Sequence, residues 1–123
     1  MKPPIPTEHV EQRSVIMWWA LFARTKRLDE RLLFAIPNGA DKSPAQAQKF
    51  KLEGLRPGVP DLFLALPRNG FAGLFIEMKR QKGKVKRGSD QEKYHALLSS
   101  MGYRVVVAAG AEEAAAAIET YVG

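Results

Sequence analysis

The sequence predicts an α/β fold in which one mixed β-sheet is flanked by helices. Short apolar segments alternate with longer helical patterns, and turns containing glycine or proline separate them. The resulting order is helix, strand, helix, strand, strand, helix, strand, helix, which places helices on the faces of one sheet. With 123 residues, 46% of them hydrophobic, the chain has the size and apolar content of one domain. We expect residues 1–123 to form this domain, with residues 1–6 as an extended tail.

The first predicted elements are a helix at residues 8–24 and a buried strand at residues 32–36. Thr7 is a good N-cap for the helix, and acids in the first turn suit the positive end of the helix dipole. A wide apolar stripe predicts that much of the helix is buried. Residues 24–31 form a charged connection, and a turn at residues 37–39 ends the strand.

The second helix is predicted at residues 45–53, because Ser43 can cap it, Pro44 suits the first helical position and Gly54 can end it. The other elements follow from apolar runs and turn residues. They are a strand at 61–65, a turn at 67–70, a strand at 73–79, a loop at 81–88, a helix from Ser89 or Asp90 to Met101, a strand at 103–109 and a helix at 112–121. The turn predicts a hairpin of the strands beside it. The strand at 103–109 should join the sheet in parallel through a right-handed crossover.

The composition excludes some classes of protein and favours others. The chain has no cysteine, so it holds neither a disulfide nor a thiolate zinc site. No apolar run approaches the ~20 residues that span a bilayer, and we expect no membrane partner. The 19 basic and 13 acidic residues give a net charge of +6, which favours a polyanionic partner such as nucleic acid.

Three charged residues lie in or beside the two strands of the predicted hairpin. Glu77 and Lys79 are two positions apart, so their side chains project from the same face of the strand, and Asp61 comes beside Glu77 if the strands pair. Two carboxylates and an ammonium group on one face can bind a hard divalent cation and act on phosphodiester bonds. The alternative is a surface salt bridge on an edge strand. We favour the catalytic interpretation, because unpaired charges among apolar strand residues are costly.

A strongly basic loop leaves the second of these strands. Its charges are well placed to bind a DNA backbone, a role that sets affinity without reading sequence. A solvated loop with no ligand is the alternative. The expected DNA-binding residues of this loop are Arg80, Lys82, Lys84, Lys86 and Arg87. The region before the strand at 61–65 can form a second wall of a DNA-binding groove, with contacts from Asn38, Lys42, Ser43 and Arg56.

The segments Gly58-Val59-Pro60-Asp61 and Ile76-Glu77-Met78-Lys79 resemble the PD-(D/E)xK nuclease superfamily. Together with Thr7 to Gln12, Phe34 to Gly39 and Gln91, they resemble more narrowly the stand-alone phage and bacterial form of the VRR-NUC domain. The resemblance implies a restriction-endonuclease-like fold, a Mg²⁺ or Mn²⁺ cofactor and cleavage of DNA, often branched or flapped. Since no secretory signal is present, we expect a cytoplasmic protein of a bacterium or of a phage-infected cell.

The resemblance also implies roles for individual residues. Asp61 and Glu77 would bind the metal with the backbone carbonyl of Met78, Lys79 would be the catalytic lysine, and Gln91 would organise the site.

A glutamate of the first helix commonly completes the metal shell in the families that this chain resembles. Glu8 and Glu11 share a helix face, and we favour Glu11, one turn deeper, with Glu8 as the alternate. The two histidines are expected to play lesser parts: His9 would lie on the surface near phosphate, and His95 would pack on a helix face.

Two other functions remain open at this point. Some relatives in the family are homodimers that resemble Holliday-junction resolvases, so a homodimer with that activity is one alternative. A non-catalytic DNA-binding module on the same fold is the other.

Overall fold

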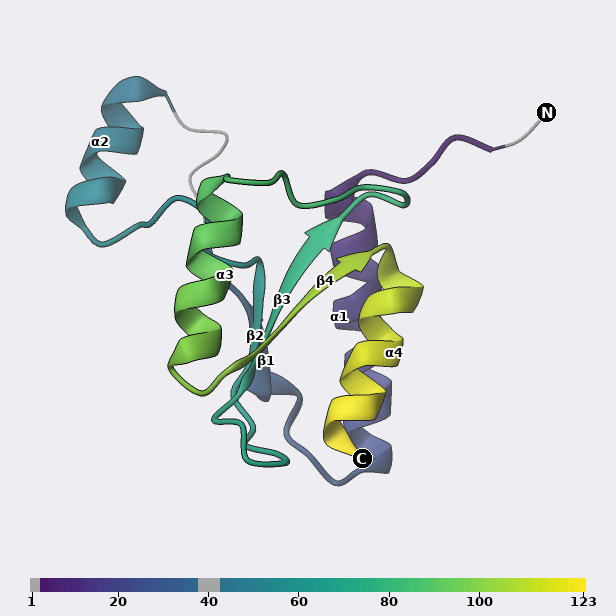
Figure 1. Ribbon diagram of the computed structural model, residues 1–123. Coiled ribbons are helices and arrows are strands. Elements are labelled where there is room, and N and C mark those ends of the chain that lie inside the picture. The colour runs from purple at the N-terminus through teal and green to yellow at the C-terminus, as the bar shows by residue number, and fades with distance from the viewer. Residues whose placement is uncertain (1–2, 38–42) are drawn as a thin grey trace.

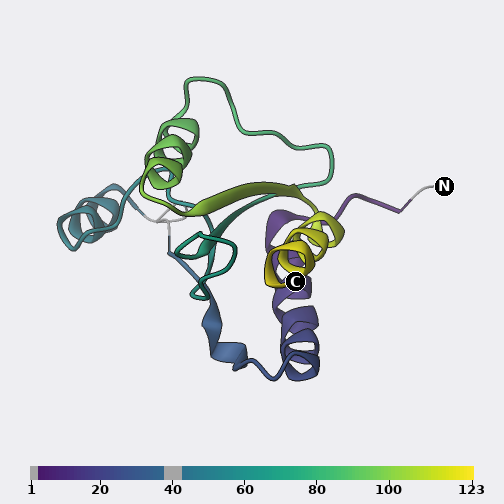
Figure 2. The same cartoon turned by 60° about the horizontal axis from the view of Figure 1, so that its bottom comes forward.

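A computed structural model of the protein, which describes residues 3–37 and 43–123, shows a four-stranded sheet with helices on both faces (Figure 1). The helices α1 (Glu8–Thr25) and α4 (Ala111–Val122) pack side by side on one face, and α3 (Asp90–Ser100) covers the other. The view in Figure 2 separates the two layers of helices. Within the described ranges each helix is too short or too polar to cross a bilayer.

The sheet has the order β1-β2-β3-β4. Its strands are β1 (Leu33–Ala35), β2 (Leu62–Leu64), β3 (Leu74–Lys79) and β4 (Arg104–Ala109). The first two pairings are antiparallel, and β3 pairs with β4 in parallel through the α3 crossover. This arrangement confirms the predicted mixed sheet with its hairpin and its parallel strand.

The pleat of β3 divides its side chains between the two faces of the sheet. Leu74, Ile76 and Met78 are fully buried, in one core with residues of α1 and α4. The alternate residues, Glu77 and Lys79, therefore project toward the face that α3 covers.

Two predicted elements differ from those observed. The connection at residues 24–31 contains the start of a short 3₁₀ helix, Glu30–Leu32, which Asp29 caps by accepting a hydrogen bond from the Arg31 N–H. The strand predicted at 32–36 is shorter and is not buried as a whole: only Leu33 is buried, and Phe34 is 46% exposed. The physical reason is that β1 lies at the edge of the sheet, where one face lacks a covering helix.

The second helix, α2 (Pro44–Leu52), is capped as predicted. Ser43 accepts from the Gln46 N–H, and the Gln46 side chain accepts from the Ser43 N–H, which completes a capping box. Both views show α2 standing apart from the sheet (Figures 1 and 2), and none of its residues is buried. The turn predicted at residues 37–39 falls largely outside the described residues.

Candidate active site

Asp61 is held at the beginning of β2 by backbone groups on both sides. Its carbonyl oxygen accepts from the Ile36 N–H at 2.8 Å, and its Oδ2 accepts from the Met78 N–H at 2.7 Å. The residue lies one position before β2, and the register that pairs Leu62 with Ile76 brings it to the level of Glu77. The hairpin thus brings the two carboxylates together, as predicted.

The segment before Asp61 explains why glycine and proline precede it. Gly58 has a φ of +85°, and a Cβ there would lie 2.5 Å from the carbonyl carbon and oxygen of Asp90. Only glycine allows this approach to the first turn of α3. Pro60 is fully buried and fixes the backbone that enters β2. These residues fasten the start of β2 against α3, the helix that faces the carboxylates.

Glu77 lies at the centre of the group and is only 2% exposed. Its Oε2 accepts from Gln91 Nε2 at 3.4 Å and lies 4.0 Å from Lys79 Nζ. Its Oε1 lies 3.5 Å from His95 Nε2. The predicted residues Asp61, Glu77, Lys79 and Gln91 therefore meet at one place, on the α3 face of the sheet.

His95 is the residue at this place that the sequence did not identify. It was expected to pack on a helix face, but its side chain is 13% exposed and faces Glu77. Gln91 and His95 are four positions apart on α3, and such a pair lies on one side of a helix. That spacing was the available signal, because it links His95 to a residue already assigned to the site.

The electrostatics of the group favour a bound cation. Burial, together with hydrogen bonding and charge from the neighbouring Glu77 carboxylate, raises the pKa of Asp61 from 3.8 to about 7. The Met78 N–H opposes this shift, and the charge of Glu8 adds to it. Two carboxylates that repel one another in this way would both be ionised more easily beside a dication.

The donor set is suited to a hard divalent ion. Glu77 Oε1 is buried and has no hydrogen-bond partner within the described ranges. Mg²⁺ uses one or two carboxylates and completes its shell with water or phosphate oxygens. Residues 3–37 and 43–123 contain no ready group of three His, Cys, Asp or Glu ligands, so Asp61 and Glu77 are the two carboxylates that already lie together.

The two acids of the first helix have different surroundings. Glu11 is 6% exposed; its Oε2 accepts from the Ala111 N–H, and its Oε1 accepts from Gln81 Nε2 at 3.3 Å. Since Gly110 provides no side-chain cap for α4, Glu11 serves as that cap from another helix. Glu8 is exposed, and it is the acid of α1 whose charge raises the pKa of Asp61.

Most of the predicted DNA-binding residues are described by the structure and are exposed, and two of them lie outside the described residues. The basic loop leaves the end of β3 and runs to the start of α3 (Figure 1), so it borders the carboxylates, and its Arg80 guanidinium donates to the Ile5 carbonyl at 3.4 Å. The other exposed basic side chains of this loop are those of Lys82, Lys84, Lys86 and Arg87. Arg56 is exposed beyond α2, whereas Asn38 and Lys42 lie outside the described residues.

Two further residues were expected near phosphate. His9 is exposed in the first turn of α1. The hydroxyl of Ser43 accepts the capping hydrogen bond of α2, so it already has a structural role.

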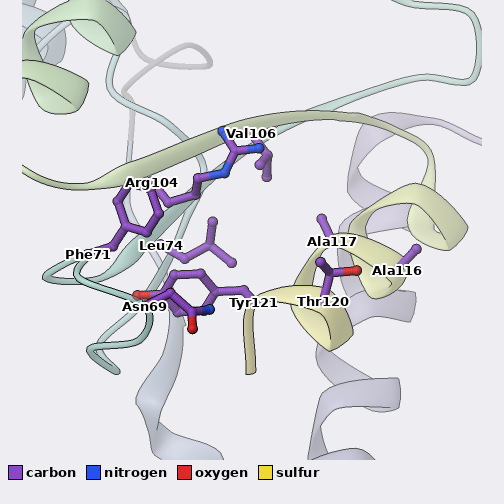
Figure 3. Close-up of a pocket in the computed structure, with 9 residues that line it drawn as sticks. All are labelled: Asn69, Phe71, Leu74, Arg104, Val106, Ala116, Ala117, Thr120 and Tyr121. Atoms are coloured by element: carbon purple, nitrogen blue, oxygen red, sulfur yellow. The ribbon is translucent and has the colours of Figure 1, made fainter. Parts of the chain in front are cut away.

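A cavity of about 330 Å³ lies elsewhere, between α4 and the sheet (Figure 3). It is lined by Asn69, Phe71, Leu74, Arg104, Val106, Ala116, Ala117, Thr120 and Tyr121. Leu74 begins β3 and Lys79 ends it, so this cavity and the carboxylates lie at opposite ends of the strand and on opposite faces. The carboxylates of the candidate site therefore lie outside this cavity.

Comparison with known proteins identifies the family. The family model of the VRR-NUC domain matches residues 4–112. The chain belongs to the VRR-NUC domain family. The VRR-NUC domain is a nuclease-type domain, and the match includes β2, β3 and α3.

A solved structure described as a "VRR_NUC domain protein" has the same fold. It is 27% identical in sequence, the alignment covers 99% of this chain and 91% of the other, and the TM-score is 0.75. The likeness confirms the restriction-endonuclease-like sheet with flanking helices. No curated protein matched this VRR-NUC chain.

Proposed function

We propose that this VRR-NUC protein is a metal-dependent endodeoxyribonuclease of the PD-(D/E)xK type, acting on structured or branched DNA. The observation that carries the proposal is the buried Glu77 beside Asp61, with Lys79 Nζ 4.0 Å away. A binding module has no evident need for a buried and a half-buried carboxylate that repel each other, since phosphate binding uses positive groups. This argues against the non-catalytic alternative.

Asp61, Glu77 and the Met78 carbonyl would hold Mg²⁺ or Mn²⁺. When bound, the metal polarises the scissile phosphate and lowers the pKa of an attacking water. Lys79 would orient that water and stabilise the negative charge that develops on the phosphate. Gln91 would hold the Glu77 carboxylate through the hydrogen bond to Oε2.

For the acid from the first helix, we propose Glu8 in place of Glu11. Both oxygens of Glu11 already accept hydrogen bonds, from the Ala111 N–H and from Gln81. Glu8 acts electrostatically on Asp61, and its carboxylate is exposed at the start of α1. Moving Glu11 into a metal shell would leave the first turn of α4 without its cap.

The substrate proposal rests on charge. The basic loop borders the carboxylates, and DNA presents one negative charge per ~1.7 Å of duplex, so loop and backbone are complementary. Arg56, which is exposed in the segment after α2, would contact the same DNA strand or the opposite one.

The test is a cleavage panel on duplex, single-stranded, flapped and four-way DNA, each with Mg²⁺, Mn²⁺ or a chelator. We expect cleavage with metal and none with chelator. Lys79→Ala should abolish cleavage and preserve DNA binding. Lys26→Ala, at the C-terminal end of α1, is the control for the loss of one positive charge. Cleavage by Lys79→Ala at the wild-type rate would contradict the mechanism. Paired cuts in the four-way DNA, together with a dimer in sedimentation, would favour the resolvase alternative.

A further inference from the structure

The helix α3 presents two side chains to one carboxylate. Gln91 and His95 are separated by one helical turn and face the two oxygens of Glu77 separately: Gln91 Nε2 is 3.4 Å from Oε2, and His95 Nε2 is 3.5 Å from Oε1. A carboxylate contacted on only one oxygen can rotate about its last bond. One that is contacted on both is fixed in orientation.

The contact with His95 involves two buried polar atoms. Glu77 Oε1 and His95 Nε2 are buried, and among the described residues neither has a hydrogen-bond partner. Burying a polar atom without a partner is unfavourable, so an arrangement that leaves these two atoms facing each other at 3.5 Å needs a reason. A hydrogen bond from His95 Nε2 to Glu77 Oε1 would satisfy both atoms.

The docking of α3 supports the same conclusion. Gly58 lets the segment before β2 approach the backbone of Asp90 and Gln91 closely, which fixes the first turn of α3 against the site. A helix fixed at its first turn presents residues at positions i and i+4 in a constant direction. His95 therefore reaches Glu77 because the helix is fastened at Gly58, and its side chain is only 13% exposed.

We propose that His95 is a positioning residue which, together with Gln91, fixes the Glu77 carboxylate for metal binding. This inference rests on the proposed function, because it assigns His95 a role only if Glu77 is a ligand. Groups that orient a ligating carboxylate typically change metal affinity about ten- to a hundredfold when they are removed. A histidine that merely fills space would leave metal affinity unchanged when a residue of similar volume replaces it.

The experiment compares His95→Leu with His95→Gln by titrating Mn²⁺ into the metal-free protein and measuring the heat of binding. Glutamine keeps an N–H donor at a similar reach, whereas leucine keeps volume without a donor. We expect the dissociation constant to rise about ten- to a hundredfold in His95→Leu and to stay within about threefold of wild type in His95→Gln. Leu97→Ala, at an exposed site two residues further along α3, is the control for a change in this helix.

Kinetics give a second readout. Below saturating Mn²⁺, kcat should fall in His95→Leu while the KM for DNA stays constant, because His95 faces Glu77 and the basic loop is left unchanged. If His95→Leu does not fold, His95→Met replaces it, with the same expectation.

Equal Mn²⁺ affinity in the leucine (or methionine) and glutamine variants would overturn the inference, whether both are normal or both are weakened. The proposed function fails differently: wild-type protein would then bind no Mn²⁺, or Glu77→Gln would cleave DNA at the wild-type rate.

Discussion

Removing the charge of Asp61 should stabilise the metal-free protein, and it should do so increasingly as the pH rises. The pKa of Asp61 is raised from 3.8 to about 7 by burial and by the Glu77 carboxylate. An acid whose pKa is higher in the folded state stabilises the fold while it is protonated. That contribution is complete below about pH 4 and is lost as the pH rises to about 7.

The magnitude follows from the shift. At about 1.4 kcal/mol for each tenfold change in proton affinity, a rise from 3.8 to about 7 corresponds to roughly 4 kcal/mol at most. Asp61 is only partly buried, so solvent screening reduces this to about 2 kcal/mol. Asparagine keeps an oxygen for the Met78 N–H and carries no charge, so Asp61→Asn should not lose this stability with pH.

The assay is urea unfolding of wild type and Asp61→Asn at pH 5 and pH 8 in the presence of a chelator. The variant should gain about 1–2 kcal/mol relative to wild type between the two pH values. Glu119→Gln, at an exposed position of α4, is the control for removing one carboxylate. A constant difference between Asp61→Asn and wild type at both pH values would refute the reasoning. Added Mn²⁺ should stabilise wild type by about 2.7 kcal/mol at 100 times the dissociation constant and leave the variant unchanged.

Three further predictions concern the surroundings of the site. Glu11→Gln should lower the free energy of unfolding by about 1 kcal/mol, because it weakens the cap of α4, and should change the Mn²⁺ affinity little. Glu8→Gln should weaken Mn²⁺ binding in calorimetry and change the free energy of unfolding little. Gly58→Ala should lower the free energy of unfolding in urea by more than about 2 kcal/mol, since a Cβ would meet the backbone of α3 at 2.5 Å. An unfolding midpoint equal to that of wild type would contradict this account. Replacing Lys84 and Arg87 by glutamine should reduce the slope of log affinity against log salt by about 2, measured by fluorescence anisotropy, and an unchanged slope would remove this loop from the DNA interface.

The hairpin of β2 and β3 and the parallel pairing of β4 could be predicted from the turn and from the crossover helix, whereas the pairing of β1 with β2 was not predicted. The alternation in β3 identified which residues share a face, and the turn before it required a hairpin. The exposure of Phe34 could not be read in the same way, because the apolar sequence of β1 is equally typical of a central strand. Its position at the edge is decided by which elements cover it in three dimensions.

The candidate site was predictable only where its residues lie on strands. Asp61, Glu77 and Lys79 follow from register and pleat. His95 follows from its four-residue spacing to Gln91 only once Gln91 is assigned to the site, and the direction in which both face depends on how Gly58 fastens α3. The choice between Glu8 and Glu11 depends on where α4 begins, since the Ala111 N–H that binds Glu11 lies 100 positions further along the chain.

The two-sided character of β3 has a consequence for how such a protein changes over generations. Leu74, Ile76 and Met78 anchor the strand from beneath, whereas Glu77 and Lys79 occupy the opposite surface. A mutation that silences the chemistry therefore leaves the anchoring layer untouched. One substitution at Glu77 or Lys79 could therefore end the proposed activity while the packing beneath the sheet is kept.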